Sequence, residues 1–155
     1  MKVNIALLTV TDTRTLKSDK SGGILANKIK KANHNLVDRK ICKDNKKDIK
    51  KILKAWTKKK NVDVIITTGG TGLTGRDITP EALNEIADKH IPGFGEVFRT
   101  ISLETVGTSS IQSRACAILS KGKYIFALPG SSGGVTDAWD KILVHQLDIN
   151  HKPCN

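Results

Sequence analysis

The sequence has 155 residues, and its hydrophobic side chains, 38% of the total, are spread along the whole length. This length and distribution predict a single globular domain covering residues 1–155. No apolar run approaches the ~18–20 residues of a membrane span, and the three cysteines show no CxxC spacing. The composition therefore argues against a membrane protein, a disulfide-rich scaffold and a secreted enzyme, and favours a cytoplasmic chain with free thiols.

Positive charge is concentrated in the first part of the chain. The net charge is +11, but residues 1–60 hold 18 Lys and Arg against 5 Asp and Glu, whereas residues 61–155 hold 8 against 10. Lysine makes up 21 of the 26 basic residues, although base-edge recognition in nucleic acids relies mainly on arginine. The charge is therefore interpreted as a solvated lysine surface, with a polyanion-binding face as the alternative.

The first half of the chain alternates apolar runs with helical patterns. Residues 3–10 form a continuous apolar run typical of a strand buried on both faces, and residues 35–42 predict a second, more polar strand. Between them, a glycine pair precedes the helical stripe of residues 24–32. Either Asp44 or Asn45 can cap the next helix. Its apolar side chains recur at i, i+3, i+4 and i+7: Ile49, Ile52, Leu53 and Trp56.

The second half begins with a third apolar strand at residues 62–67. After a glycine-rich loop, Thr79, Pro80 and Glu81 mark a helix start, with Thr79 as the N-cap and an acid in the first turn. Two apolar runs separated by the sequence SKGK predict an antiparallel hairpin. The remaining elements are a helix at 93–104, the hairpin strands at 114–119 and 124–128, and a final helix with Val135, Ala138, Trp139, Ile142, Leu143 and Leu147.

This order of elements predicts an α/β fold with a mostly parallel sheet, one antiparallel hairpin element and helices on both faces. In such sheets, ligands bind beyond the carboxyl ends of the strands. Four loops leave those ends and hold most of the loop Gly, Ser, Thr and Asp residues: 11–22, 43–45, 68–79 and 129–134. The sequence therefore predicts the functional site at that edge of the sheet.

The loop at residues 68–79 contains the spacing GxGxxG, from Gly70 to Gly75. A dinucleotide-binding fingerprint needs its third glycine to open a helix, whereas Asp77 and Pro80 delay this helix by about four residues. A P-loop is also excluded, because an Arg-Asp pair stands where Lys-Ser/Thr is required. The loop instead predicts a phosphate-binding nest of backbone N–H groups, with Asp77 holding Mg²⁺ against the phosphate. The alternative is a plain glycine turn with Asp77 capping the next helix.

The segment from Gly130 to Gly134 matches GxSxG, the nucleophile elbow of α/β-hydrolases. A hydrolase would also need an acid and a histidine in the short remainder of the chain. His145 lies inside the final helical pattern and His151 lies in the tail, and no HExxH or paired-ligand spacing supports a zinc site. The segment is therefore interpreted as a phosphate- or substrate-binding turn, with a simple strand–helix connection as the alternative.

Acidic residues follow each of the first three predicted strands: Asp12, Asp44 and Asp77. Taken singly, an aspartate at such a position more often caps a helix or stabilises a turn. Because the carboxyl ends of parallel strands meet at one edge of a sheet, the three acids are expected to lie close together. Their coincidence favours a shared functional site.

Four sequence blocks resemble the molybdenum cofactor biosynthesis protein B (MoaB) family, within the wider MoaB/MogA molybdopterin-binding fold. The resemblance covers essentially the whole chain, and the tail sequence HKPCN at 151–155 is also similar to the MoaB branch. The blocks are TTGGTGLTGRDITPEAL (67–83), IPGFGEVFR (91–99), GTSSIQSRA (107–115) and ALPGSSGGVTDAWDKIL (127–143).

The resemblance implies a three-layer α/β sandwich assembled as a trimer or a hexamer. It also implies binding of molybdopterin and Mg²⁺-dependent adenylylation of its phosphate by ATP, which gives adenylyl-molybdopterin and pyrophosphate. Asp44 and Asp77 match acids implicated in catalysis or in holding Mg²⁺. The matching substrate-binding loops contain Asp12, Thr68, Gly69, Gly70, Thr71, Gly72, Pro129, Gly130, Ser131 and Ser132.

Two other functions remain open from the sequence. A pterin-binding or carrier protein of the same pathway would bind molybdopterin but form no adenylate. A basic nucleic-acid-binding domain would show salt-dependent affinity for arbitrary duplexes. The sequence, however, lacks the aromatic stacking platform or recognition-helix pattern that such a domain needs.

Overall fold

The computed structural model describes residues 2–148, which contain six strands: β1 (Asn4–Val10), β2 (Asn35–Cys42), β3 (Val64–Thr68), β4 (Lys89–His90), β5 (Cys116–Ser120) and β6 (Lys123–Leu128). They form one sheet in the order β2-β1-β3-β6-β5-β4. Strands β2, β1, β3 and β6 run parallel. β5 pairs antiparallel with β6, which confirms the predicted hairpin, and β4 pairs antiparallel with β5 at the sheet edge.

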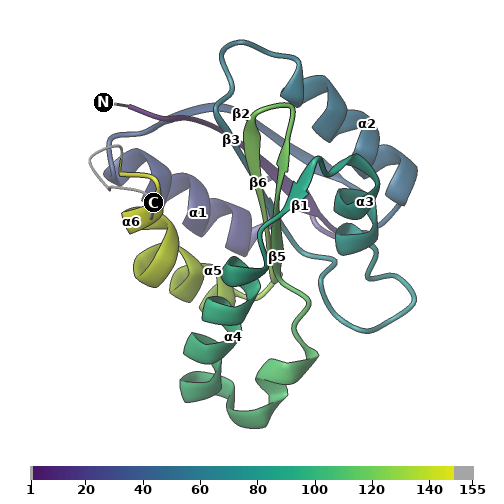
Figure 1. The fold of residues 1–155 in the computed structure, drawn as a ribbon, viewed down its shortest axis with the longest axis vertical. Helices are drawn as coiled ribbons and strands as arrows, with labels where there is room; N and C mark the ends of the chain where they lie inside the picture. The colour runs from purple at the N-terminus through teal and green to yellow at the C-terminus, as the bar shows by residue number, and fades with distance from the viewer. Residues whose placement is uncertain (1, 149–155) are drawn as a thin grey trace.

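Helices cover both faces of this sheet and give the fold three layers (Figure 1). α1 (Lys20–Lys31), α4 (Pro92–Val106) and α5 (Ser132–Ala138) pack on one face, and α2 (Lys46–Thr57) and α3 (Thr79–Ile86) pack on the other. A 3₁₀ turn, η1 (Gly107–Gln112), follows α4, and a π-helical turn, η2 (Trp139–Leu143), joins α5 to α6 (Val144–Gln146). This arrangement confirms the expected α/β sandwich with a mostly parallel sheet.

The central strands are buried on both faces because successive side chains enter different cores. In β1, Ile5 and Leu7 belong to the core beneath α1, α4 and α5. Ala6 and Leu8 belong to the core beneath α2 and α3. All four side chains are fully buried. The strand is therefore apolar from Ile5 to Leu8, and the alternation of a half-exposed strand is absent from this stretch.

The start of α3 differs from the sequence prediction, and β4 was not predicted. Ile78 occupies the N-cap of α3, and Thr79 is its first residue. Thr79 does not cap the helix, because its hydroxyl donates a 2.9 Å hydrogen bond to the carbonyl oxygen of Gly69. β4 has two exposed residues, which is too short to leave a periodic pattern in the sequence.

Side-chain caps define the starts of α1 and α2. α1 begins at Lys20 with Asp19 as its N-cap, so the glycine pair lies inside its first turn and not ahead of it. For α2, the sequence left two candidates for the N-cap, Asp44 and Asn45. Asn45 is the cap, because its side-chain oxygen accepts hydrogen bonds from two backbone N–H groups of the first turn, at 2.9 and 3.2 Å.

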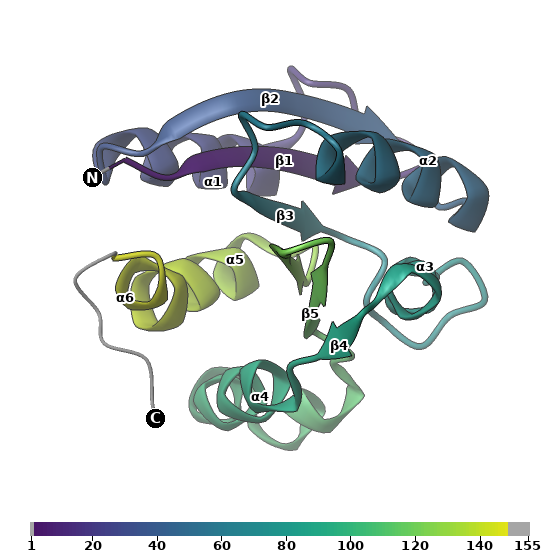
Figure 2. The same cartoon turned by 45° about the horizontal axis from the view of Figure 1, so that its top comes forward.

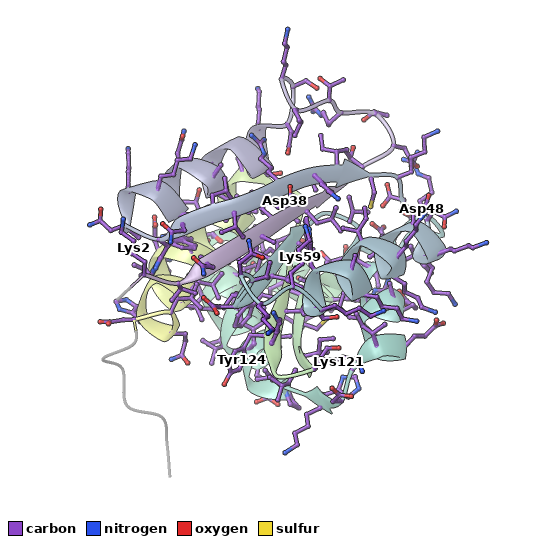
Figure 3. All side chains as sticks on the ribbon, turned by 90° about the horizontal axis from the view of Figure 1, so that it is seen from above. Lys2, Asp38, Asp48, Lys59, Lys121 and Tyr124 are labelled. Atoms are coloured by element: carbon purple, nitrogen blue, oxygen red, sulfur yellow. The ribbon has the colours of Figure 1, made fainter. Side chains whose placement is uncertain are left out.

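The lysine-rich surface over β2 and α2 includes several local ion pairs. Asp38 and Lys59 lie near one another in Figure 3, with 4.0 Å between the carboxylate and the ammonium group. Glu85, on α3, pairs with Lys46 at 2.6 Å and with Lys50 at 2.5 Å. Local carboxylates thus compensate part of the positive charge, which supports the interpretation of this region as a solvated surface.

None of the helices in residues 2–148 combines the length and the apolar character needed to cross a membrane. The HKPCN segment, whose sequence is similar to the MoaB branch, lies outside the described residues. His151 lies outside them as well.

Candidate functional site

A glycine-rich loop packs tightly against the end of β1 at the carboxyl edge of the sheet. Gly69 and Gly70 follow β3 with φ angles of +98° and +70°, in the region that favours glycine. A Cβ atom on Gly69 would overlap the carbonyl oxygen of Val10, and one on Gly70 would overlap the hydroxyl of Thr79. Both positions therefore require glycine for the loop to approach its neighbours.

A cavity of about 330 Å³ opens between this loop and the starts of α1 and α5. Arg14, Lys20 and the hydroxyl of Ser21 contribute to its wall. The N-terminus of α1 also faces it, and backbone N–H groups at a helix start favour a negatively charged ligand. The wall contains five of the substrate-binding residues expected from the sequence: Thr68, Gly69, Gly130, Ser131 and Ser132.

A buried carboxylate, Asp19, stabilises one wall of this cavity. Asp19 is 5% exposed. It accepts hydrogen bonds from the Thr9 hydroxyl at 2.6 Å, the Gly22 backbone N–H at 3.0 Å and Arg39 Nη2 at 3.2 Å. These partners satisfy the buried charge and hold the first turn of α1 against β1 and β2. Sequence spacing does not predict the ion pair between Asp19 and Arg39, because it depends on strand pairing.

A second cavity, of about 160 Å³, shares part of its wall with the first. Asp12, Asp44 and Asp77 all line it, as expected for acids that follow three parallel strands. Asp12 Oδ1 accepts a 3.0 Å hydrogen bond from the backbone N–H of Asp44. Arg76 Nη1 lies 3.7 Å from Asp12 Oδ2. The carboxyl edge thus combines a carboxylate-lined cavity with one that suits an anion.

Asp44 and Asp77 have opposite pKa shifts. Burial raises the pKa of Asp44 above its ordinary value, and the negative charges of Asp12 and Asp77 raise it further. Burial also acts to raise the pKa of Asp77, but hydrogen bonds to its carboxylate outweigh this effect and the pKa is lowered. Asp77 Oδ2 accepts from the backbone N–H and the hydroxyl of Thr74, at 2.9 and 2.7 Å. Asp77 therefore ionises readily, whereas a nearby cation would stabilise the ionised form of Asp44.

The donor atoms of the small cavity suit a hard cation such as Mg²⁺. Across residues 2–148, no group of three or more His, Cys, Asp or Glu side chains forms a ready-made metal site. Mg²⁺ does not need one, because it binds through one or two carboxylates together with water and substrate phosphate oxygens. Asp44 and Asp77 provide suitable carboxylates, and a bound cation would offset the burial and the repulsion that raise the pKa of Asp44.

Three of the expected substrate-binding residues lie behind or beside these two cavities. Thr71 is 4% exposed, and its carbonyl oxygen accepts a 2.9 Å hydrogen bond from the backbone N–H of Arg114. Gly72 lies directly against the carboxylate of Asp77, where a Cβ atom would collide with it. Pro129 borders a third cavity, of about 580 Å³, between α4, η1 and α5.

Arg114 is a site residue that sequence analysis missed. Its side chain donates from Nε to the carbonyl oxygen of Gly72 at 2.7 Å and from Nη2 to that of Asp77 at 2.8 Å. It also forms an ion pair with Glu81. Arg114 falls within the block at 107–115 that carries the family resemblance, but no chemical motif there connects it with the glycine-rich loop.

Comparisons with known proteins agree with this fold. Residues 6–148 match a family model described as "Probable molybdopterin binding domain". The chain is 44% identical over 151 residues to molybdenum cofactor biosynthesis protein B of Escherichia coli strain K12, covering 97% of this chain and 89% of that protein. The match therefore extends over nearly the full length of both sequences.

Two solved structures extend the comparison to three dimensions. A crystal structure of a molybdenum cofactor biosynthesis protein B superimposes with a TM-score of 0.92 at 43% identity, covering 95% of this chain and 92% of that one. The tungsten cofactor synthesizing protein MoaB from Pyrococcus furiosus gives a TM-score of 0.84 at 34% identity, covering 96% and 95%. Fold and loops together define a domain of the molybdopterin-binding class. Within that class, the chain belongs to the MoaB family of molybdenum cofactor biosynthesis proteins.

Proposed function

We propose that this chain binds molybdopterin and transfers the adenylyl group of Mg-ATP to the molybdopterin phosphate, releasing pyrophosphate. The supporting observation is that a cavity lined by Asp12, Asp44 and Asp77 adjoins a larger one lined by hydroxyl groups, Arg14 and Lys20. A reaction between two phosphate-bearing substrates needs anion-binding groups and a carboxylate site for a cation. Membership of the MoaB family supports the pterin as the substrate class.

In the proposed reaction, an oxygen of the pterin phosphate attacks the α-phosphorus of ATP, and the bond to pyrophosphate breaks. No general base is required, because a phosphate monoester is already largely ionised near pH 7. Ser131 and Ser132 orient phosphate oxygens, and Lys20 offsets the triphosphate charge. Asp44 and Asp77 would hold Mg²⁺, which would supply neutralising charge to the phosphate oxygens.

The test of this proposal is adenylyl transfer by wild-type protein and the Asp77→Asn variant. With molybdopterin, Mg²⁺ and α-labelled ATP, the wild type should place label on the pterin. Asp77→Asn should lower that rate by about 100-fold or more, because the amide keeps an acceptor for Thr74 but loses the negative charge. Asp48→Asn is the control, since Asp48 lies exposed on α2 and should retain wild-type activity. Equal rates for Asp77→Asn and wild type would contradict the assigned role of Asp77.

The second candidate function is a molybdopterin carrier without catalysis. It is favoured by the cavity of about 330 Å³, whose hydroxyl groups, Arg14 and Lys20 can bind a phosphate group without a metal ion. A carrier would retain molybdopterin in equilibrium dialysis, with no requirement for Mg²⁺, and would transfer no label from ATP. Wild-type protein that binds the pterin under these conditions but gives no adenylate would therefore favour the carrier over the enzyme.

A further inference from the structure

Arg114 connects both ends of the loop segment that carries Asp77. Its Nε donates to the carbonyl oxygen of Gly72 at 2.7 Å, and its Nη2 donates to the carbonyl oxygen of Asp77 at 2.8 Å. Within the segment, the backbone N–H of Asp77 donates to the carbonyl oxygen of Thr74 at 3.0 Å. The planar guanidinium thus fixes the separation between two backbone oxygens that flank the turn.

Arg114 is itself held in place from the opposite side by α4. The side chain of Arg99, on this helix, donates from Nη1 to the carbonyl oxygens of Ser113 and Ala115, at 3.2 and 3.0 Å. The backbone N–H of Arg114 donates to the carbonyl oxygen of Thr71. Hydrogen bonds therefore hold the backbone of Arg114 and of the residues before and after it. This leaves the Arg114 side chain little freedom to move away from the loop.

We infer that Arg114 is a positioning residue, which orients the carboxylate of Asp77 for adenylyl transfer by holding the carbonyl oxygens of Gly72 and Asp77. The inference rests on the proposed function for its catalytic consequence, but not for its effect on the loop. Lysine cannot take the place of this arginine, because a single ammonium group lacks the planar fork that reaches two fixed acceptors. Arg114→Lys therefore separates the geometry of the side chain from its charge.

The first measurement is amide hydrogen exchange in wild-type protein, Arg114→Lys and Glu81→Gln. Glu81→Gln is the matched control, because it removes the charge that pairs with the guanidinium of Arg114 and keeps an oxygen acceptor. Arg114→Lys should accelerate exchange at Thr74 and Asp77 while the amides of β1 keep wild-type exchange. A general loss of stability would instead accelerate exchange throughout the sheet. Unchanged loop exchange in Arg114→Lys, or acceleration spread over all strands, would overturn the inference.

The second measurement is the kinetics of adenylyl transfer by the same proteins. Arg114→Lys should lower kcat by about 100-fold with little change in KM, since small misplacements of a reacting group have effects of this size. Glu81→Gln should retain wild-type kcat. A wild-type kcat in Arg114→Lys would overturn the catalytic part of the inference. An inactive wild type would contradict the proposed function instead, and hydrogen exchange would then decide the positioning role by itself.

Discussion

At the scale of single residues, the properties of the site depend on how its carboxylates are paired. Two hydrogen bonds from Thr74 stabilise the charge on Asp77. Burial raises the pKa of Asp44, and the negative charges of Asp12 and Asp77 beside it raise the pKa further. Neighbouring acids in one cavity therefore differ in how readily they ionise, and the less readily ionised one has more to gain from a cation.

This difference predicts that Asp12→Asn lowers the pKa of Asp44. Removing the negative charge of Asp12 favours the ionised form of its neighbour, so Asp44 should lose its proton at a lower pH than in the wild type. Carboxyl carbon NMR titration without divalent cations measures the shift directly. Asp63→Asn is the control. Asp63 lies before β3, at the amino ends of the parallel strands, so this variant should leave the pKa of Asp44 unchanged. An equal or higher pKa in Asp12→Asn would show that the two carboxylates do not interact as described.

At the scale of secondary structure, helix starts determine where the site residues lie. The first turn of α1 is fixed by Asp19, which also accepts a hydrogen bond from Thr9 on β1. α2 starts at the cap Asn45, directly after Asp44. The same short connections that begin these helices therefore place their neighbouring side chains along the carboxyl edge of the sheet.

The cap of α2 can be tested by its contribution to stability. Asn45→Ala should lower the free energy of unfolding by about 1 kcal/mol, because two backbone N–H groups lose their acceptor. Urea unfolding measures this change, and the dependence on urea concentration should stay the same. Asp44→Ala removes the other candidate cap named from the sequence and should not produce this loss. The reverse order of stability would mean that Asp44 caps the helix.

At the scale of the whole molecule, apolar surface remains exposed on α4 and η1. Leu103 is 50% exposed, Val106 53% and Ile111 79%. Figure 2 shows α4 at the opposite end of the molecule from β2. Neighbouring exposed apolar side chains often belong to a contact between subunits. This surface therefore provides a candidate interface for the trimer or hexamer that the family resemblance implies.

We expect the chain to sediment as a trimer or a hexamer, with α4 and η1 at a subunit contact. The double variant Leu103→Asp, Ile111→Asp should shift sedimentation equilibrium toward the monomer, because it places negative charges in the contact. Leu16 is 53% exposed on a different loop, and Leu16→Asp should leave the assembly unchanged. A wild-type chain that is monomeric at micromolar concentration would contradict this expectation.

The sequence was sufficient to locate most elements of the fold, because the geometry of a buried strand or helix determines which positions must be apolar. The two cores that sandwich β1 require apolar residues from Ile5 to Leu8, and the buried side of α2 requires Ile49, Leu53 and Trp56 at helical spacing. The meeting of Asp12, Asp44 and Asp77 at one cavity was also predicted, since parallel strands end at a common edge. These features follow from residue spacing and from the order of the elements along the chain.

Tertiary structure decided the contacts that join residues distant in sequence. Arg114 and Asp77 are 37 positions apart, and Arg39 and Asp19 are 20 apart, so neither pair produces a periodic signal. The role of Thr79 was likewise not evident from the sequence. Its residue type suggested a helix cap, but its hydroxyl donates a hydrogen bond to the carbonyl oxygen of Gly69 in the glycine-rich loop. Sequence patterns report which faces must be buried, whereas the partner of a polar side chain depends on which segments the complete fold places within hydrogen-bonding distance.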